Sequence, residues 1–156
     1  MAHEYAATVS WKRGSDEPFI DNKYSRGHSW VFDGGVTVPA SSSPLSVRLP
    51  FSRADAVDPE EALVAALSSC HMLTFLYLAA KQGFVIDTYD DEPVGIMTKN
   101  ARGKLFMSRV TLRPRIAFSG PKHPNPAELA QLHHHAHEEC YIANSVLTEV
   151  TIETPH

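Results

Sequence analysis

The sequence predicts an α+β fold in which antiparallel sheets are wrapped around long central helices. Two observations carry this prediction. Short runs of alternating apolar residues precede, separate and follow two segments with helical spacing of apolar residues, and the first of these helical segments is apolar on nearly every side. Strands and helices grouped in this order are typical of the α+β class. The 156 residues and the 43% hydrophobic content suit a single domain spanning 1–156.

The first strands are predicted from short runs near the N-terminus. Residues 4–11 alternate apolar and polar side chains, and residues 29–32 form a second run of this kind. The turn signal Asp33-Gly34-Gly35 then joins that run to residues 36–38 as a β-hairpin. Residues 45–49 predict a further short strand.

A long helix is predicted after these strands. Asp58 is a favourable N-cap, Pro59 suits the first helical position, and Glu60 complements the positive end of the helix dipole. Gly83 is expected to end the helix as a C-cap. Residues 62–80 are almost entirely apolar, so this helix is expected at the centre of the fold.

The second half of the chain repeats the pattern of strands followed by a helix. Strands are expected within 84–94 and 95–118. The strict alternation over 109–118 predicts a strand with one solvent-exposed face. A second helix is predicted from Asn125 to about Tyr141, and residues 145–153 alternate as a last strand.

Composition excludes several classes of function. A net charge of -4 and a pI near 6.1 leave no basic stripe for nucleic acid. No stretch is expected to supply the roughly 20 apolar residues that span a bilayer, so no membrane partner is predicted. The first residues show neither a basic start nor an apolar run, so we expect no signal peptide and a cytoplasmic protein. No glycine-rich phosphate loop is present, and no nucleotide cofactor is expected.

Cys70 and Cys140 are the two cysteines of the chain, and each lies late in a predicted apolar helix. Free cysteines are often small buried hydrophobes, and this is one interpretation of both residues. The other is a reactive pair, because two packed helices can bring Cα atoms within the ~7 Å that a disulfide needs. In a reducing compartment such a disulfide would be transient rather than structural.

A reactive thiolate is usually activated by a nearby cation or a helix N-terminus. Cys70 lies too deep in its own helix for the helix dipole to act, so a cation would have to come from elsewhere in the fold. Arg26 is the candidate, although the favoured interpretation from the residues alone is a solvated loop arginine, and Arg13 is the competing residue. Glu60 follows Pro59 in the first helical turn, where the dipole alone accounts for an acid.

Glu60 and Cys70 are separated by roughly 15 Å of rise along an unbroken helix. The two side chains therefore cannot touch within one straight helix. If both serve one site, either the helix bends or two chains share the site.

A metal site is a third possibility. His133 and His137 are one helical turn apart, and Cys140 follows three residues later, which is a spacing that zinc can use. The polar face of a surface helix explains the same pattern.

Two segments resemble the OsmC/Ohr family of thiol peroxidases, whose names stand for osmotically inducible protein C and organic hydroperoxide resistance protein. These segments are Asp58-Pro59-Glu60-Glu61…Ser68-Ser69-Cys70-His71 and Ala136-His137-Glu138-Glu139-Cys140…Asn144. The resemblance covers almost the whole chain and is closer to the general OsmC-like branch than to the hydroperoxide-resistance branch. Tyr141 stands where the family usually has proline after its second cysteine.

The resemblance implies an intertwined homodimer with two sites at the interface. It implies a peroxidatic Cys70, a resolving Cys140 and an Arg26–Glu60 pair that polarises the thiolate. The implied activity is reduction of organic hydroperoxides without a metal or cofactor, with a small dithiol or a lipoylated protein as reductant. Apolar residues near Cys70 are expected to line a substrate pocket: Leu67, Leu73, Phe75 and Tyr77. A non-catalytic stress-related redox or binding protein and a zinc-binding module are the alternatives.

Overall fold

The computed structural model describes residues 1–154 and confirms an α+β fold with two α-helices among mainly antiparallel strands. The chain divides into two compact units, Met1–Ala62 and Leu63–His156. The interpretation of 1–156 as one domain stays a prediction.

The first unit contains a three-stranded antiparallel sheet of β1 (Ala7–Ser10), β2 (His28–Phe32) and β3 (Thr37–Ala40). The strand predicted within 4–11 and the predicted hairpin are both present. Gly35 has a φ of 87°, a left-handed conformation that glycine adopts without steric cost, in the turn between β2 and β3.

The strand predicted over 45–49 is wrong, because this segment forms turns. The backbone N–H groups of Ser46 and Val47 donate to the carbonyl of Ser43 at 3.0 and 2.9 Å. The Ser43 hydroxyl accepts from the N–H of Leu45 at 3.1 Å. Serine side chains compete in this way with the hydrogen bonds of a strand.

Helix α1 (Pro59–Lys81) begins after the predicted N-cap Asp58, which also forms a capping box with Glu61. The N–H of Glu61 donates to Asp58 Oδ1 and the N–H of Asp58 donates to Glu61 Oε1, both at 2.8 Å. Gly83, with a φ of 81°, lies just beyond the C-terminal end.

One narrow stripe of α1 is buried, and it consists of residues four apart: Leu67, His71, Phe75 and Ala79. Leu73 and Tyr77 lie outside this stripe and remain 61% and 62% exposed. The helix is therefore apolar both on the side that it buries and on a side that this chain leaves open.

Helix α1 has 23 residues, and by length and composition it could cross a membrane. The expectation that no stretch is apolar enough for this is wrong, because Ser68, His71 and Thr74 interrupt the apolar run only briefly. The core helix of a globular protein meets the same criterion. The absence of a membrane partner stays a prediction.

The second unit contains two sheets. Strand β4 (Val85–Asp90) pairs antiparallel with β7 (Arg115–Ser119). Strands β5 (Val94–Lys99), β6 (Leu105–Leu112) and β8 (Glu149–Ile152) form the other sheet, in which β6 and β8 are parallel.

The single strand predicted over 109–118 is wrong, because β6 ends at Leu112 and β7 begins at Arg115 in the other sheet. Pro114 lies in the break, and its missing N–H cannot continue a ladder. The last strand is also shorter than the predicted 145–153, since Ala143–Ser145 is a short 3₁₀ helix, η1.

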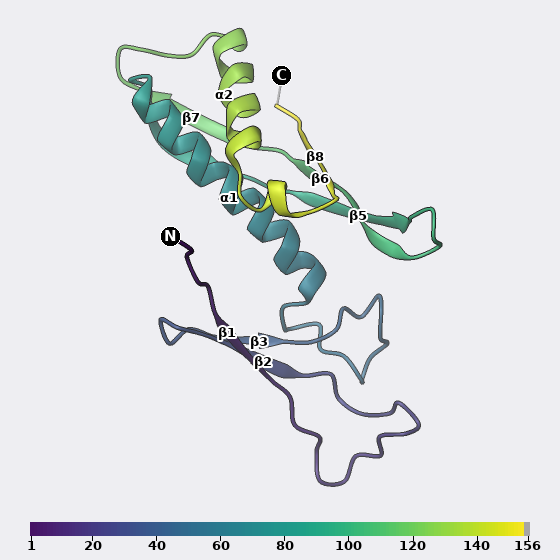
Figure 1. Ribbon diagram of the computed structural model, residues 1–156. Coiled ribbons are helices and arrows are strands. Elements are labelled where there is room, and N and C mark those ends of the chain that lie inside the picture. Colours follow the sequence, from purple (N-terminus) through teal and green to yellow (C-terminus); the bar gives the residue numbers. More distant parts are fainter. Residues whose placement is uncertain (155–156) are drawn as a thin grey trace. The chain divides into compact units, whose positions relative to one another are not determined.

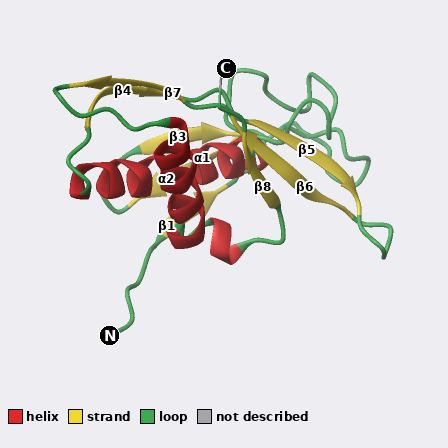
Figure 2. Ribbon diagram, turned by 90° about the horizontal axis from the view of Figure 1, so that it is seen from above, coloured by secondary structure: helices red, strands yellow, loops and turns green. Residues whose placement is uncertain are grey.

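Helix α2 (Pro126–Glu139) lies beside α1 (Figures 1 and 2) and ends two residues earlier than predicted. Asn125 and Glu128 form its capping box. Both helices contribute to one core cluster together with the residue that precedes β4: Phe75, Ala79, Phe84, Leu132 and Ala136.

A hydrogen bond also joins the two helices inside the core. His71 Nε2 of α1 and His133 Nδ1 of α2 are 3.0 Å apart, and the residues are only 1% and 4% exposed. Burial lowers the pKa of both imidazoles from 6.5 to about 4, and for His71 the neighbouring His133 and His137 lower it further. Both rings are therefore neutral at pH 7.

We expect Leu132→Ala to lower the free energy of unfolding by about 2 to 5 kcal/mol, because it opens a cavity in this core. Leu132 is fully buried, whereas Leu147 is 93% exposed. The same substitution at Leu147 should therefore change stability by less than about 0.5 kcal/mol. Urea denaturation measures both, and equal losses would contradict the placement of Leu132.

Acid should destabilise the fold through His71 and His133. Their pKa values are depressed in the folded state, so the unfolded chain binds more protons and stability is lost as pH falls from about 6.5 towards 4. The slope is at most about 1.4 kcal/mol per pH unit for each histidine. Urea denaturation at pH 7, 6 and 5 measures this loss. In the double variant His71→Leu/His133→Leu the urea midpoint should change less between these pH values than in the wild-type protein. The control His3→Gln, at an exposed position, should show the same dependence of stability on pH as the wild-type protein.

Candidate functional site

The two thiols of the chain are neighbours. Cys70 lies in the middle of α1 and is half-buried, and Cys140 is the C-cap of α2 and is buried. Burial, together with the neighbouring Cys70 side chain, raises the pKa of the Cys140 thiol to about 11. Both cysteines are free thiols in this structure. The helices thus bring together, within one chain, the two residues that the sequence singled out.

The end of α2 fixes the position of Cys140. Its N–H donates to the carbonyl of His137 at 3.3 Å, and its sulfur accepts from the N–H of Ala143 at 3.4 Å. Asn144 donates from its side chain to the carbonyls of Glu138 and Cys140 at 2.8 and 3.1 Å. Asn144 therefore satisfies carbonyl groups that the helix end would leave unpaired.

The sequence patterns do not predict the contact between His71 and His133. They mark His71 only as the residue after Cys70, and His133 only as a candidate metal ligand. A signal for His71 was available, because it stands four residues after Leu67 and four before Phe75, both of which are buried. A signal for His133 was available too, because it follows Leu129 by four residues and precedes Ala136 by three, a helical spacing that His134 and His135 do not share.

Arg26 lies in the first unit, and backbone carbonyls hold its guanidinium. Nη1 donates to the carbonyls of Asn22 and Tyr24 at 2.7 and 2.6 Å. Its Cζ lies 3.8 Å from the centroid of the Tyr24 ring, a cation–π contact. A small pocket of about 370 Å³ is lined by Arg26 and mainly aromatic or apolar neighbours: Val9, Trp11, Phe19, Tyr24, His28 and Ser42.

The competing residue Arg13 is on the exposed loop, where its Nη1 donates to the carbonyl of Glu17. Arg26 is half-buried. Of the two arginines, only Arg26 is therefore held by its neighbours in the lining of a pocket.

Glu60 is half-buried in the first turn of α1, and its Oε2 is buried without a hydrogen-bond partner among residues 1–154. The ion pairs within this part of the chain include neither Glu60 nor Arg26. The Arg26–Glu60 pair that the resemblance implies is therefore not formed within one chain.

The described residues provide no set of ligands for the zinc-binding alternative. Over the described residues 1–154, no three His, Cys, Asp or Glu side chains are grouped so that they could hold a metal ion. The neighbouring histidines have other partners, since His134 lies 3.4 Å from Glu138 and His135 lies 2.8 Å from Gln131.

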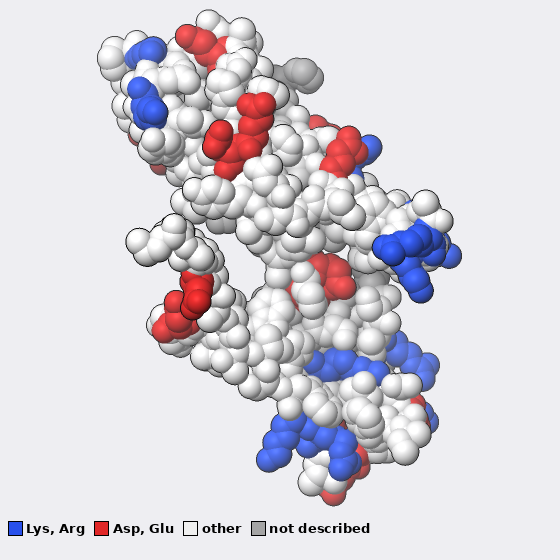
Figure 3. All heavy atoms as spheres, viewed as in Figure 1, with Lys and Arg blue, Asp and Glu red and all other residues white. Residues whose placement is uncertain are grey.

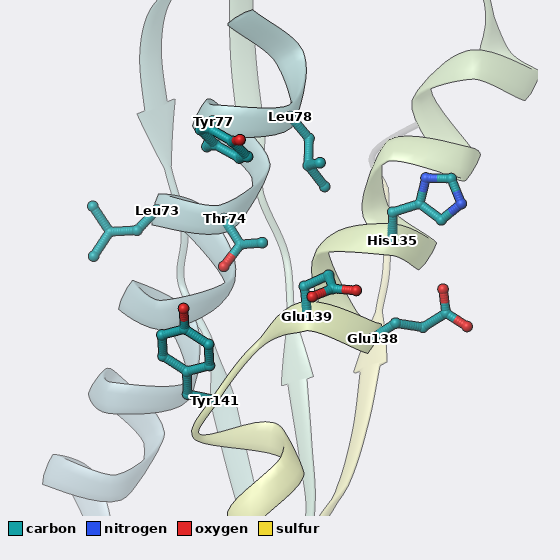
Figure 4. A pocket seen from close by; sticks show the side chains of 8 residues that line it. All are labelled: Leu73, Thr74, Tyr77, Leu78, His135, Glu138, Glu139 and Tyr141. Carbon is teal, nitrogen blue, oxygen red and sulfur yellow. The ribbon is translucent and has the colours of Figure 1, made fainter. Parts of the chain in front are cut away.

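A pocket of about 800 Å³ opens between α1 and the end of α2 (Figure 4). Its lining comes from both helices and the residue after Cys140: Leu73, Thr74, Tyr77, Leu78, His135, Glu138, Glu139 and Tyr141. Of the four residues expected to line an apolar pocket around Cys70, Leu73 and Tyr77 line this pocket, whose lining includes neither Cys70 nor Cys140. The prediction is wrong for Leu67 and Phe75, which lie in the core.

Charged side chains form separate small groups of both signs on the face shown in Figure 3.

Comparison with known proteins identifies the fold. Residues 52–155 match the family model described as OsmC-like protein. The structure of an OsmC-like protein of unknown function, VCA0330 from Vibrio cholerae, is 52% identical, with a TM-score of 0.96 over 99% of this chain and 100% of that one. No curated protein matches.

More distant structures share the fold alone. An OsmC-like protein from Mycoplasma pneumoniae is 14% identical, with a TM-score of 0.73 over 99% of this chain and 98% of its own. The organic hydroperoxide resistance protein OhrB of Bacillus subtilis is 18% identical, with a TM-score of 0.65 over 97% and 98%. The chain therefore belongs to the OsmC-like family.

Proposed function

We propose that this protein is a cysteine-based peroxidase that reduces organic hydroperoxides through a Cys70 sulfenic acid and a Cys70–Cys140 disulfide. The observation that carries the proposal is the meeting of these two thiols from α1 and α2 within one chain. Membership of the OsmC-like family supports it, because fold relatives include proteins named for organic hydroperoxide resistance.

The surroundings of the two thiols favour different roles. Cys70 is half-buried, so a substrate can reach it more easily than the buried Cys140. The raised pKa of Cys140, about 11, keeps that residue a protonated thiol near neutral pH. A thiol is a poor nucleophile compared with a thiolate. Cys70 is therefore assigned the attack on peroxide, and Cys140 is assigned the second step.

In the first step the Cys70 thiolate attacks the terminal oxygen of the hydroperoxide. An S–O bond forms, the O–O bond breaks, and the leaving alkoxide takes up a proton to give the alcohol. Cys70 is thereby oxidised to sulfenic acid.

In the second step the sulfur of Cys140 attacks the sulfur of the Cys70 sulfenic acid. An S–S bond forms and the S–O bond breaks, and the departing hydroxide leaves as water with the proton of the Cys140 thiol. A dithiol, either small or carried as lipoyl on a protein, then reduces the disulfide by thiol–disulfide exchange. No metal or organic cofactor is required.

The pocket between the helices supports an organic rather than an inorganic peroxide. Leu73, Tyr77 and Leu78 give it an apolar wall on the same helix as Cys70. An apolar wall of this kind favours the carbon skeleton of an organic hydroperoxide over hydrogen peroxide.

The exposed side of α1 supports a homodimer. Leu73 and Tyr77 are more than half exposed, and Ala65, Ala66 and Ala80 on the same helix are exposed as well. A helix that is apolar on several sides is normally buried. A second copy of the chain would cover this surface.

Arg26 and Glu60 support a site shared by two chains. Within residues 1–154 the guanidinium has no carboxylate partner, and Glu60 Oε2 is buried without any partner. A buried carboxylate without a partner is costly. In the proposed dimer Arg26 and Glu60 of one chain lie against Cys70 of the other chain, where arginine stabilises the thiolate.

Cys70→Ser should reduce peroxide consumption to the background rate with tert-butyl hydroperoxide and dihydrolipoamide, because the attacking sulfur is lost. Cys140→Ser should complete one turnover and then accumulate sulfinic acid on Cys70, since no second thiol traps the sulfenic acid. Stopped-flow assays and intact-mass spectrometry measure these outcomes. Wild-type protein that forms a disulfide but consumes no organic hydroperoxide would instead favour the non-catalytic redox or binding function.

Mixing Cys70→Ser chains with Glu60→Ala chains should restore about a quarter of the wild-type sites. At equal amounts about half of the dimers are mixed, and each mixed dimer has one site with both Cys70 and Glu60 intact. Activity after subunit exchange measures the recovery, and native mass spectrometry verifies that mixed dimers form. Mixing Cys70→Ser with Cys140→Ser is the matched control and should restore no steady turnover, because both thiols of a site come from one chain. Mixed dimers without activity would contradict the shared site.

A further inference from the structure

The buried His71–His133 pair has no part in the proposed chemistry, yet it lies between the two helices that carry the thiols. The rings lie within 10° of parallel, with centroids 5.3 Å apart. Because the facing nitrogens are only 3.0 Å apart, the contact runs from ring edge to ring edge, as a directed N–H···N hydrogen bond requires. Phe75 lies over the pair, with its ring centroid 4.5 Å from that of His133.

This hydrogen bond constrains both rings. A neutral imidazole has one N–H and one lone pair, so one ring donates and the other accepts. The outer atoms, His71 Nδ1 and His133 Nε2, are buried and have no hydrogen-bond partner within residues 1–154. The contact between the rings is therefore the interaction that compensates for burying them.

The pair and the thiols share the same two helices. His71 directly follows Cys70 on α1, and His133 precedes Cys140 by seven residues, about two turns, on α2. Apolar packing between the helices, as in the core cluster that Ala79 shares with Leu132 and Ala136, is not directional and tolerates sliding. A hydrogen bond in the plane of the rings tolerates much less sliding of one helix along the other.

We infer that the His71–His133 hydrogen bond is a positioning contact that fixes α2 against α1 and so holds Cys140 where it meets Cys70. This inference rests on the proposed dithiol function for its effect on turnover. Its direct consequence is a higher equilibrium constant for closing the Cys70–Cys140 disulfide, because thiols held together need less ordering to form the bond.

The test measures that constant in glutathione redox buffers at pH 7 and does not involve peroxide. His71→Leu and His133→Leu should each lower the constant for disulfide formation by about tenfold, the effect expected for loss of one hydrogen bond, which is a shift of about 30 mV. His71→Gln and His133→Asn place an amide near the bonding nitrogen and should retain the constant within about threefold.

The single Leu variants could lose stability because each leaves one imidazole without its partner. The double variant His71→Leu/His133→Leu controls for this, because replacing both partners leaves no polar group facing an apolar one. It should still lower the constant about tenfold. His134→Leu, at an exposed position of α2 outside the lining of the pocket, is the matched control and should leave the constant unchanged.

Two failures are distinguishable. If the double Leu variant is folded by circular dichroism and closes the disulfide as readily as wild type, the positioning role is wrong while the dithiol function stands. If the wild-type chain forms no Cys70–Cys140 disulfide in any glutathione buffer, the proposed function fails and the inference fails with it.

Discussion

The packing of α2 against α1 is the contact on which the candidate site depends. Cys70 and Cys140 are 70 residues apart in the sequence, and the strands β4 to β7 lie between them. The core cluster that includes Phe75 and Leu132 closes this long segment, and burial of its apolar surface offsets the entropy of closure. The thiols are neighbours because the helices are. Any change that shifts α2 on α1 therefore acts on the chemistry of the pair.

Helix α1 has an apolar side that packs in the core and an apolar side that this chain leaves open, and its sequence reflects both. Its buried stripe, with Leu67 and Phe75, belongs to the core of the second unit. Its open side carries Leu73 and Tyr77, which line the pocket beside α2. A helix that served only its own core would have a polar face towards water. The apolar character all round α1 is explained by a core on one side and, in the proposed dimer, a partner on the other.

Local signals predicted the parts of the fold that are determined locally. The capping residues Asp58 and Asn125 and the glycine at 83 correctly marked the helix ends. The strand predicted across Pro114 failed because alternation alone does not show where a strand changes sheets. The His71–His133 contact was not predictable in this way, because it depends on which turn of α2 faces α1. The meeting of Cys70 and Cys140 was predictable only because both helices had apolar faces.

The candidate site separates two requirements that reactive cysteines usually meet together. Its proposed redox pair is complete within one chain, since α1 and α2 supply both thiols. Its proposed electrostatic pair is not, because Arg26 contacts backbone carbonyls and the Tyr24 ring, and Glu60 Oε2 is unpaired over residues 1–154. Carbonyl groups orient a guanidinium without neutralising it, so Arg26 keeps the charge that a thiolate needs nearby. In the proposed mechanism disulfide closure is thus a property of the single chain, whereas activation of the thiolate depends on association with a second copy.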